Sequence, residues 1–160
     1  MSKSLKRVVA AAEALGLNIQ PVTMEVSTKT AREAADAIGS AVDQIAKSII
    51  FRGMASELPI LFVTAGSNRV DPAKAAGVAG EGLGKADAAF IRAMTGFAIG
   101  GVSPIGHIGP VRAFWDPCLN DYSTIWAAAG TPHHMFEIAP IQLQQAIGAA
   151  VGEFTQSDQG

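Results

Sequence analysis

The sequence is poor in the residues that cross-link a chain or ligate metals. Its single cysteine, Cys118, excludes a disulfide framework and a cysteine-rich zinc site. Charged residues make up 16% and hydrophobic residues 49%, which excludes a disordered tail and a highly charged scaffold. The mean hydropathy is +0.27, but no apolar run approaches the roughly 18 to 20 residues that a membrane helix needs. We therefore expect one globular domain over residues 1–160, in a reducing cytoplasm.

Basic residues are absent from the end of the chain. All 12 Lys and Arg lie in residues 1–112, whereas the charged residues of 113–160 are all Asp or Glu. The net charge is −2, and a tight, sequence-independent nucleic-acid binder would carry a much stronger basic field. Contact with a nucleic acid is therefore expected to be local, weak and confined to the N-terminal two-thirds. Composition alone favours the alternative, a solvated surface without such a role.

Apolar spacing and capping signals predict helices and strands in irregular order. We expect helices over Ser4–Leu15, 30–39 and 87–95, and a short alanine-rich helix that opens at Asp71-Pro72. A last helix is expected from Pro140, with Leu143, Ile147 and Val151 on its buried face. We expect strands over Ile45–Arg52, Pro59–Thr64, Val111–Phe114, Thr124–Ala128 and Met135–Ile138. The order is not the strict alternation of a Rossmann domain. It predicts an α+β fold with a mixed, partly barrel-like β-sheet and surrounding helices.

Lys47 is the most informative single residue. In a strand over Ile45–Arg52, side chains alternate, so Lys47 shares a face with Ile45, Ile49 and Phe51. An ammonium on an apolar face is costly unless it opens into a cleft or meets an anion. The alternative is a lysine that extends along the surface to reach water.

The glycine-rich segment Gly100–His107 is the second signal. Glycines let a backbone approach a ligand closely and direct several N–H groups at one point, as oxyanion sites require. The segment does not match a phosphate-binding P-loop, because no Gly-Lys-Ser/Thr ending is present, nor does it have Gly-x-Gly-x-x-Gly spacing. A tight connection between strands is the alternative interpretation.

The histidines and the cysteine form no metal or nucleophile pattern. His133 and His134 are adjacent and would face opposite ways on a strand, so no metal site is expected. His107 follows the glycine segment and could donate to a ligand or orient water, although a satisfied loop histidine is equally compatible. Ser103 lacks a Gly-x-Ser-x-Gly elbow. Cys118 is expected to be a small buried hydrophobe.

Taken together, these residues resemble the YbaK family, whose members share a fold with the editing domain of bacterial prolyl-tRNA synthetases. The resemblance covers about residues 20–152. Its marks are Thr30–Ala35, Ile45–Phe51, Asn68–Asp71, Thr95-Gly96, Ile99–Gly106, Asp116, Ala129-Gly130 and the helix after Ala139-Pro140. The lysine strand, followed about fifty residues later by Gly-Gly-Val-Ser-Pro, is the specific part.

The resemblance implies a free-standing trans-editing hydrolase. Such an enzyme cleaves the ester between a wrong amino acid and the 3′ end of a tRNA. Lys47 matches the essential lysine of the family. Residues Gly100, Gly101, Val102, Ser103 and Pro104 match its loop that lines the aminoacyl pocket, and Gly130 matches a glycine on the strand opposite. No cofactor and no metal are implied.

The resemblance also implies partners and a substrate class. The partners are the acceptor end of a tRNA (tRNA-Pro among the candidates) and a synthetase such as prolyl-tRNA synthetase, without a membrane or DNA. Residues 131–136 lack the polar or acidic residue of many relatives that act on cysteinyl-tRNA. Together with His107 as a substrate-side residue, this favours another small amino acid, such as serine, threonine, alanine or a non-protein analogue. Two alternatives stay open: a non-catalytic module that binds a tRNA end or a small metabolite, and a structural interaction domain.

Overall fold

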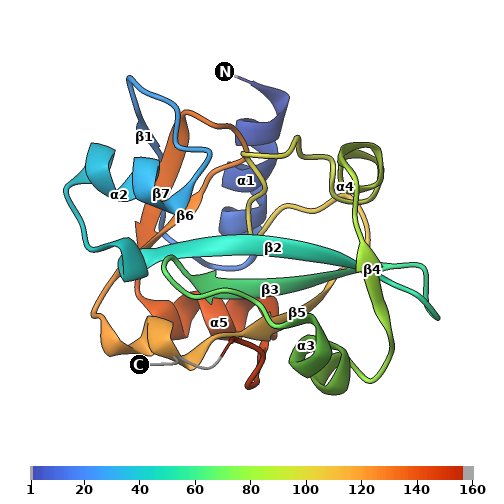
Figure 1. The fold of residues 1–160 in the computed structure, drawn as a ribbon. Coiled ribbons are helices and arrows are strands. Elements are labelled where there is room, and N and C mark those ends of the chain that lie inside the picture. Colours follow the sequence, from blue (N-terminus) through green and yellow to red (C-terminus); the bar gives the residue numbers. More distant parts are fainter. Residues whose placement is uncertain (1, 157–160) are drawn as a thin grey trace.

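The structure, a computed structural model, describes residues 2–156 and has one mixed eight-stranded sheet with helices around it (Figure 1). The helices are α1 (Lys3–Ala14), α2 (Ala31–Ile38), α3 (Pro72–Ala79), α4 (Ala88–Thr95) and α5 (Pro140–Ile147), with 3-10 helices η1 (Val42–Gln44) and η2 (Pro117–Asp121). The strands are β1 (Val22–Thr23), β2 (Ile45–Gly53), β3 (Pro59–Ala65), β4 (Leu83–Lys85), β5 (Arg112–Trp115), β6 (Ile125–Ala128), β7 (His134–Ile138) and β8 (Ala150–Val151). The expected α+β class is confirmed. Within this part of the chain, no helix has the length and apolar character to cross a membrane.

Strand β2 is the centre of the sheet because three strands pair with it. The strand order is β1-β7-β6-β2-β3-β5-β8, and β4 pairs with β2 off this path. β2 runs antiparallel to β3 and β4 but parallel to β6. The long β2–β3 ladder places Lys47 opposite Thr64. Gly66, the residue after β3, is therefore close to Lys47 in space, although the β2–β3 hairpin separates the two residues in the sequence.

Local capping signals set the helix boundaries as the sequence predicted. The N–H of Glu33 donates to Thr30 Oγ1 at 3.1 Å, and the N–H of Thr30 donates to Glu33 Oε1 at 3.2 Å. This reciprocal capping box fixes the start of α2. Asp71 and Asp87 cap α3 and α4 because their carboxylates accept N–H groups of the first helical turn.

The end of α5 differs from the prediction. Helical spacing extended its buried face to Val151, but Gly148 adopts φ +64° and ends the helix after Ile147. Val151 lies instead in β8, which pairs in parallel with β5, and 56% of its surface is exposed. The prediction for Val151 was wrong because pairing with a distant strand took over immediately after the glycine.

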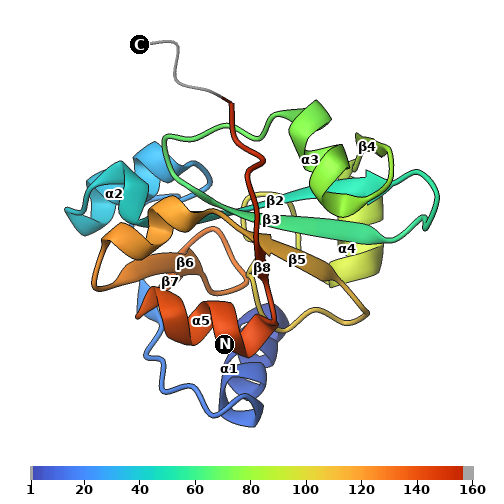
Figure 2. The ribbon, with the colours of Figure 1, turned by 90° about the horizontal axis from the view of Figure 1, so that it is seen from below.

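The two faces of the sheet are covered differently. The largest apolar cluster joins one face to α1, α4 and α5. On the other face, Ala75 and Ala79 of α3 cover one end, and Ala34 and Ala35 of α2 cover the other. Figure 2 shows α2 and α3 on one side of the sheet, and α1 and α5 on the other. The two short helices on the α2–α3 side belong to separate clusters, so a stretch of β2 between them lacks a helix above it.

Candidate functional site

Lys47 projects where β2 is uncovered. On its face of the strand, Ile45 packs under α2, while Ile49 and Phe51 pack with the α3 cluster. Lys47 lies between these two contacts and is half-buried. The alternation of the strand therefore explains why a lysine occurs on an apolar face: it opens into the space between two helices.

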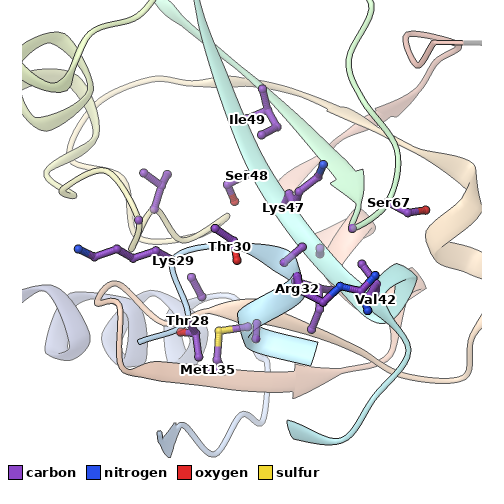
Figure 3. A pocket seen from close by; sticks show the side chains of 18 residues that line it. Thr28, Lys29, Thr30, Arg32, Val42, Lys47, Ser48, Ile49, Ser67 and Met135 are labelled. Carbon is purple, nitrogen blue, oxygen red and sulfur yellow. The ribbon is translucent and has the colours of Figure 1, made fainter. Parts of the chain in front are cut away.

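A cavity of about 520 Å³ opens beside Lys47 and is bounded by α2. Its volume is within the size range of small-ligand sites. Its walls are the segment before and within α2, the strand β2, the turn after β3, the glycine-rich segment and the start of β7. In Figure 3 the amine of Lys47 is directed toward the turn that carries Ser67, and Lys29 lies on the other side of the cavity. The lining residues are Thr28, Lys29, Thr30, Ala31, Arg32, Ala34, Val42, Ile45, Ala46, Lys47, Ser48, Ile49, Gly66, Ser67, Gly100, Val102, Ala128 and Met135.

The ammonium of Lys47 is held by a backbone carbonyl. Nζ donates to the carbonyl oxygen of Asn68 at 2.5 Å. Burial lowers the pKa of Lys47 from its ordinary value, and the charge of Arg69 lowers it further, while Asp43 and Asp116 oppose this shift. The position of the Lys47 ammonium is thus set by the Asn68 carbonyl, and its pKa is set by burial and by the neighbouring charges.

The turn that supplies this carbonyl is fastened to η1. The carboxylate of Asp43 accepts hydrogen bonds from the N–H of Ser67, at 2.8 Å, and from its hydroxyl. Gly66 lies so close to η1 that a Cβ atom there would be 2.0 Å from the carbonyl oxygen of Val42. A side chain at Gly66 is therefore excluded, and the turn keeps a fixed distance from Lys47.

Gly100 and Val102 form the opposite wall. Gly100 adopts φ +92°, and a Cβ atom there would be 2.8 Å from the Lys29 side chain. The N–H of Gly101 donates to the carbonyl oxygen of Ala98 at 3.1 Å. Within residues 2–156, the N–H groups of Gly100 and Val102 have no hydrogen-bond partner. Because Gly100 and Val102 also line the cavity, their N–H groups are the candidate donors of this segment to a ligand there.

The rest of the glycine-rich segment turns away from the cavity. Ser103 is fully buried, and its carbonyl oxygen is 2.7 Å from His107 Nε2. Pro104 and His107 line a different cavity, of about 210 Å³. The His107 ring packs edge-on against Phe97, and burial lowers its pKa. The structure therefore places His107 behind the segment, not beside Lys47.

Gly101 and Gly130 are packing positions. A Cβ atom at Gly101 would be 2.8 Å from the Cα of Thr131, so the glycine-rich segment lies directly against the β6–β7 turn. Gly130 adopts φ +97°, and a Cβ atom there would be 2.8 Å from the carbonyl oxygen of Ser4 in α1. Neither glycine lines the cavity, although Ala128 on the strand before Gly130 does.

The cavity has a positive rim, of which only Lys47 was predicted from the sequence as a site residue. Lys29, Arg32 and Lys47 line it, and no aspartate or glutamate does. Within the described part of the chain, the ion pairs are Arg52–Glu57 and Arg112–Glu81, so none of the three cavity cations is paired. Lys29 directly precedes the capping box of α2 and Arg32 lies within it, so this box was the one signal that could have placed them here.

The lining contains no obvious general base. It has neither an imidazole nor a thiol, in addition to lacking carboxylates. Cys118 is exposed, which corrects the prediction of a buried side chain: it follows Pro117 on η2, on the surface side of that short helix. The arrangement suits the binding of an anionic ligand and the polarisation of a carbonyl group by N–H donors and an ammonium.

Comparisons with known proteins identify the family and the fold of this chain. The sequence pattern of the aminoacyl-tRNA editing domain family matches residues 25–146. A Bacillus subtilis (strain 168) relative, "Uncharacterized protein YwhH", is 31% identical over 121 residues, which is 76% of each chain. A crystal structure of a proposed trans-editing enzyme for prolyl-tRNA synthetase has 40% identity and a TM-score of 0.91, covering 98% of this chain and 99% of that one.

A more distant solved structure has the same architecture. The crystal structure of hypothetical protein APE2540 has 25% identity and a TM-score of 0.86, and it covers 94% of this chain and 99% of that chain. The family match covers well over half of the present chain and includes Lys47, Gly100 and Val102. The chain belongs to the aminoacyl-tRNA editing domain family.

Proposed function

We propose that this chain is a trans-editing aminoacyl-tRNA deacylase, an ester hydrolase that removes a mischarged small amino acid from the 3′ end of a tRNA. The observation that carries the proposal is the cavity between α2, β2 and the glycine-rich segment. Lys47, Gly100 and Val102 line this one cavity, and the N–H groups of Gly100 and Val102 have no hydrogen-bond partner within the described residues. Family membership supports an editing function, and the trans-editing role described for the 40% identical structure supports this form of it.

The chemistry needs no covalent intermediate. A water oxygen attacks the ester carbonyl carbon, and the bond from that carbon to the ribose oxygen breaks. The two N–H groups stabilise the negative charge that develops on the carbonyl oxygen. One proton of the water ends on the ribose oxygen, so the products are the free amino acid and the tRNA 3′-hydroxyl.

The proton acceptor in this scheme belongs to the substrate. Because the described lining offers no carboxylate or imidazole, we assign the role to the neighbouring ribose hydroxyl or the α-amine of the aminoacyl group. Lys47 then binds the terminal phosphate or ribose and holds the ester beside the N–H groups. An aminoacyl ester is already activated, so positioning and charge stabilisation suffice.

The rim and the cavity volume indicate which substrate fits. Lys29 and Arg32 would contact the phosphates that precede the terminal nucleotide, because they line the cavity without acidic partners. The cavity of about 520 Å³ has room for a small aminoacyl group and part of its ribose. We further propose tRNA-Pro as a substrate, prolyl-tRNA synthetase as a partner, and the cytoplasm, where tRNA is charged, as the place of action.

A deacylation panel tests the proposal. Purified protein is incubated with tRNAs that carry cysteine, serine, threonine, alanine or 2-aminobutyrate, with and without prolyl-tRNA synthetase. We expect release of one or two of the small amino acids at a rate well above spontaneous hydrolysis. Saturable binding of every charged tRNA without release would contradict the proposal and identify a non-catalytic binding module.

Salt dependence tests the role of the rim. Each single-strand phosphate contact contributes about −0.7 to the slope of log K against log salt concentration. The double variant Lys29→Gln/Arg32→Gln should therefore flatten the slope of log kcat/KM by about 1.4. The control is Lys6→Gln/Arg92→Gln, which removes two exposed cations that do not line the cavity. An equal change in both double variants would contradict the rim assignment.

A further inference from the structure

A buried carboxylate lies behind the turn that holds Lys47. Asp116, the N-cap of η2, is 1% exposed. Burial of a carboxylate is costly unless its oxygens are hydrogen-bonded. Asp116 meets this requirement through three N–H donors: those of Ala65 at 3.0 Å, the Asn68 side-chain amide at 2.8 Å and Cys118 at 3.0 Å.

Two of these three donors belong to the turn. Oδ2 of Asp116 accepts both the backbone N–H of Ala65, at the end of β3, and the side-chain amide of Asn68. The turn between them is closed by the N–H of Asn68, which donates to the carbonyl oxygen of Ala65 at 2.9 Å. One carboxylate oxygen therefore fixes both ends of the turn.

The carbonyl oxygen of that same Asn68 is the acceptor for Lys47. We propose that Asp116 is a positioning residue for Lys47, acting through Asn68: the carboxylate fixes the turn, and the turn's carbonyl fixes the ammonium at the cavity. Asp116 does not itself contact Lys47 through a hydrogen bond or ion pair within the described residues. This inference deepens the proposed function and rests on it for its kinetic consequences.

The charged groups around Lys47 set the direction of the electrostatic effect. Arg69 follows the turn, Asp43 lies on η1 and Asp116 on η2, while Lys29 and Arg32 face the same cavity. Removal of the Asp116 charge takes away one of the two carboxylates that oppose the lowering of the Lys47 pKa. The neutral amine fraction of Lys47 should therefore rise at a given pH.

The test uses Asp116→Asn, which keeps the size but removes the charge and one acceptor. The matched control is Asp121→Asn, the same chemical change at an exposed position of η2. The first readout is the rate at which acetic anhydride acylates Lys47, followed by peptide mass spectrometry across a pH series. We expect several-fold faster acylation at neutral pH in Asp116→Asn and no change in Asp121→Asn. Equal rates in all three folded proteins would overturn the inference.

The second readout is kinetic. Displacement of a positioned group by about 1 Å can cost on the order of 100-fold in rate, so we expect Asp116→Asn to lower kcat/KM by about 10- to 100-fold. Asn68→Ala, which keeps the backbone carbonyl but loses the tie to Asp116, should lower it similarly. The double variant should be no worse than the more severe single variant, because both changes break one connection. Fully additive losses would contradict the relay.

These readouts separate two kinds of failure. Acylation of Lys47 does not require deacylase activity, so it tests the positioning even where no amino acid is released from any tRNA. If Asp116→Asn fails to fold, as judged by its thermal transition, Asn68→Ala decides the question. In that variant, unchanged kcat/KM together with unchanged acylation of Lys47 would overturn the inference.

Discussion

Arg7 on α1 binds the chain both before and within the glycine-rich segment, and its replacement is the sharpest test of the packing. Its Nε donates to the carbonyl oxygen of Gly106 at 2.8 Å, and an Nη donates to that of Gly96 at 2.9 Å. The guanidinium also lies 4.6 Å from the centroid of the Phe97 ring. One planar side chain therefore joins α1 to the backbone at both Gly96 and Gly106. A lysine cannot reproduce this arrangement.

The expected magnitude follows from these contacts. Hydrogen bonds to a charged donor contribute about 1.5–3 kcal/mol each, and a partly exposed cation–π contact about 0.5–1 kcal/mol. We predict that Arg7→Ala lowers the free energy of unfolding by about 4 kcal/mol, and that Arg7→Lys, which keeps one hydrogen bond, lowers it by about 2 kcal/mol.

Urea unfolding measures this directly. The control is Arg92→Ala. Arg92 is an exposed arginine on α4 whose side chain has no hydrogen bond or ion pair within the described part of the chain, so this variant should stay within about 0.5 kcal/mol of the wild type. The reasoning would be refuted if Arg7→Ala were also within that margin, or if Arg7→Lys were as damaging as Arg7→Ala.

Three further predictions concern other parts of the fold. Gly101→Ala should destabilise the protein by about 1–3 kcal/mol, because its Cβ would be 2.8 Å from the Cα of Thr131; a thermal melt as stable as the wild type's would contradict this. Thr30→Ala should cost about 1 kcal/mol through the lost cap of α2, measured by urea unfolding, and an unchanged midpoint would count against it. Burial lowers the pKa of His107 below the 6.5 of an exposed histidine, so the unfolded chain binds a proton that the folded protein excludes, and stability should fall as the pH drops below about 6.5. His107→Gln, which can still donate to Ser103, should flatten that decline between pH 7.5 and 5.5 (again by urea unfolding), and an unchanged slope would contradict the assignment.

Features with local causes were predictable from the sequence. The capping box of Thr30 and Glu33 and the Asp71-Pro72 start of α3 appear where expected, since caps depend on neighbouring residues only. The long strands β2 and β3 were also found within a residue of their bounds. The two- and three-residue strands β1, β4 and β8 were not predicted, because they are too short for alternation to show and form only through pairing with distant strands.

The candidate site was predictable in part. Alternation along β2 indicated that Lys47 needs a cleft, but it could not show that α2 and α3 leave one open. The link between Asn68 and Asp116 joins positions 48 residues apart, so spacing alone gave no sign of it. His107 was expected near the ligand because it follows the glycine segment. Gly106, at φ +83°, turns the chain so that His107 lies behind it.

The central claim is that Lys47 and the adjacent N–H groups form a hydrolytic site for aminoacyl esters. The most direct test is single-turnover release of the amino acid from a mischarged tRNA-Pro by wild-type protein, Lys47→Ala and the control Lys85→Ala. Lys85 is an exposed lysine on β4, away from the cavity lining. We predict that Lys47→Ala slows release by about 100-fold or more while its thermal transition stays cooperative, and that Lys85→Ala matches the wild type. Wild-type release by folded Lys47→Ala would contradict the account.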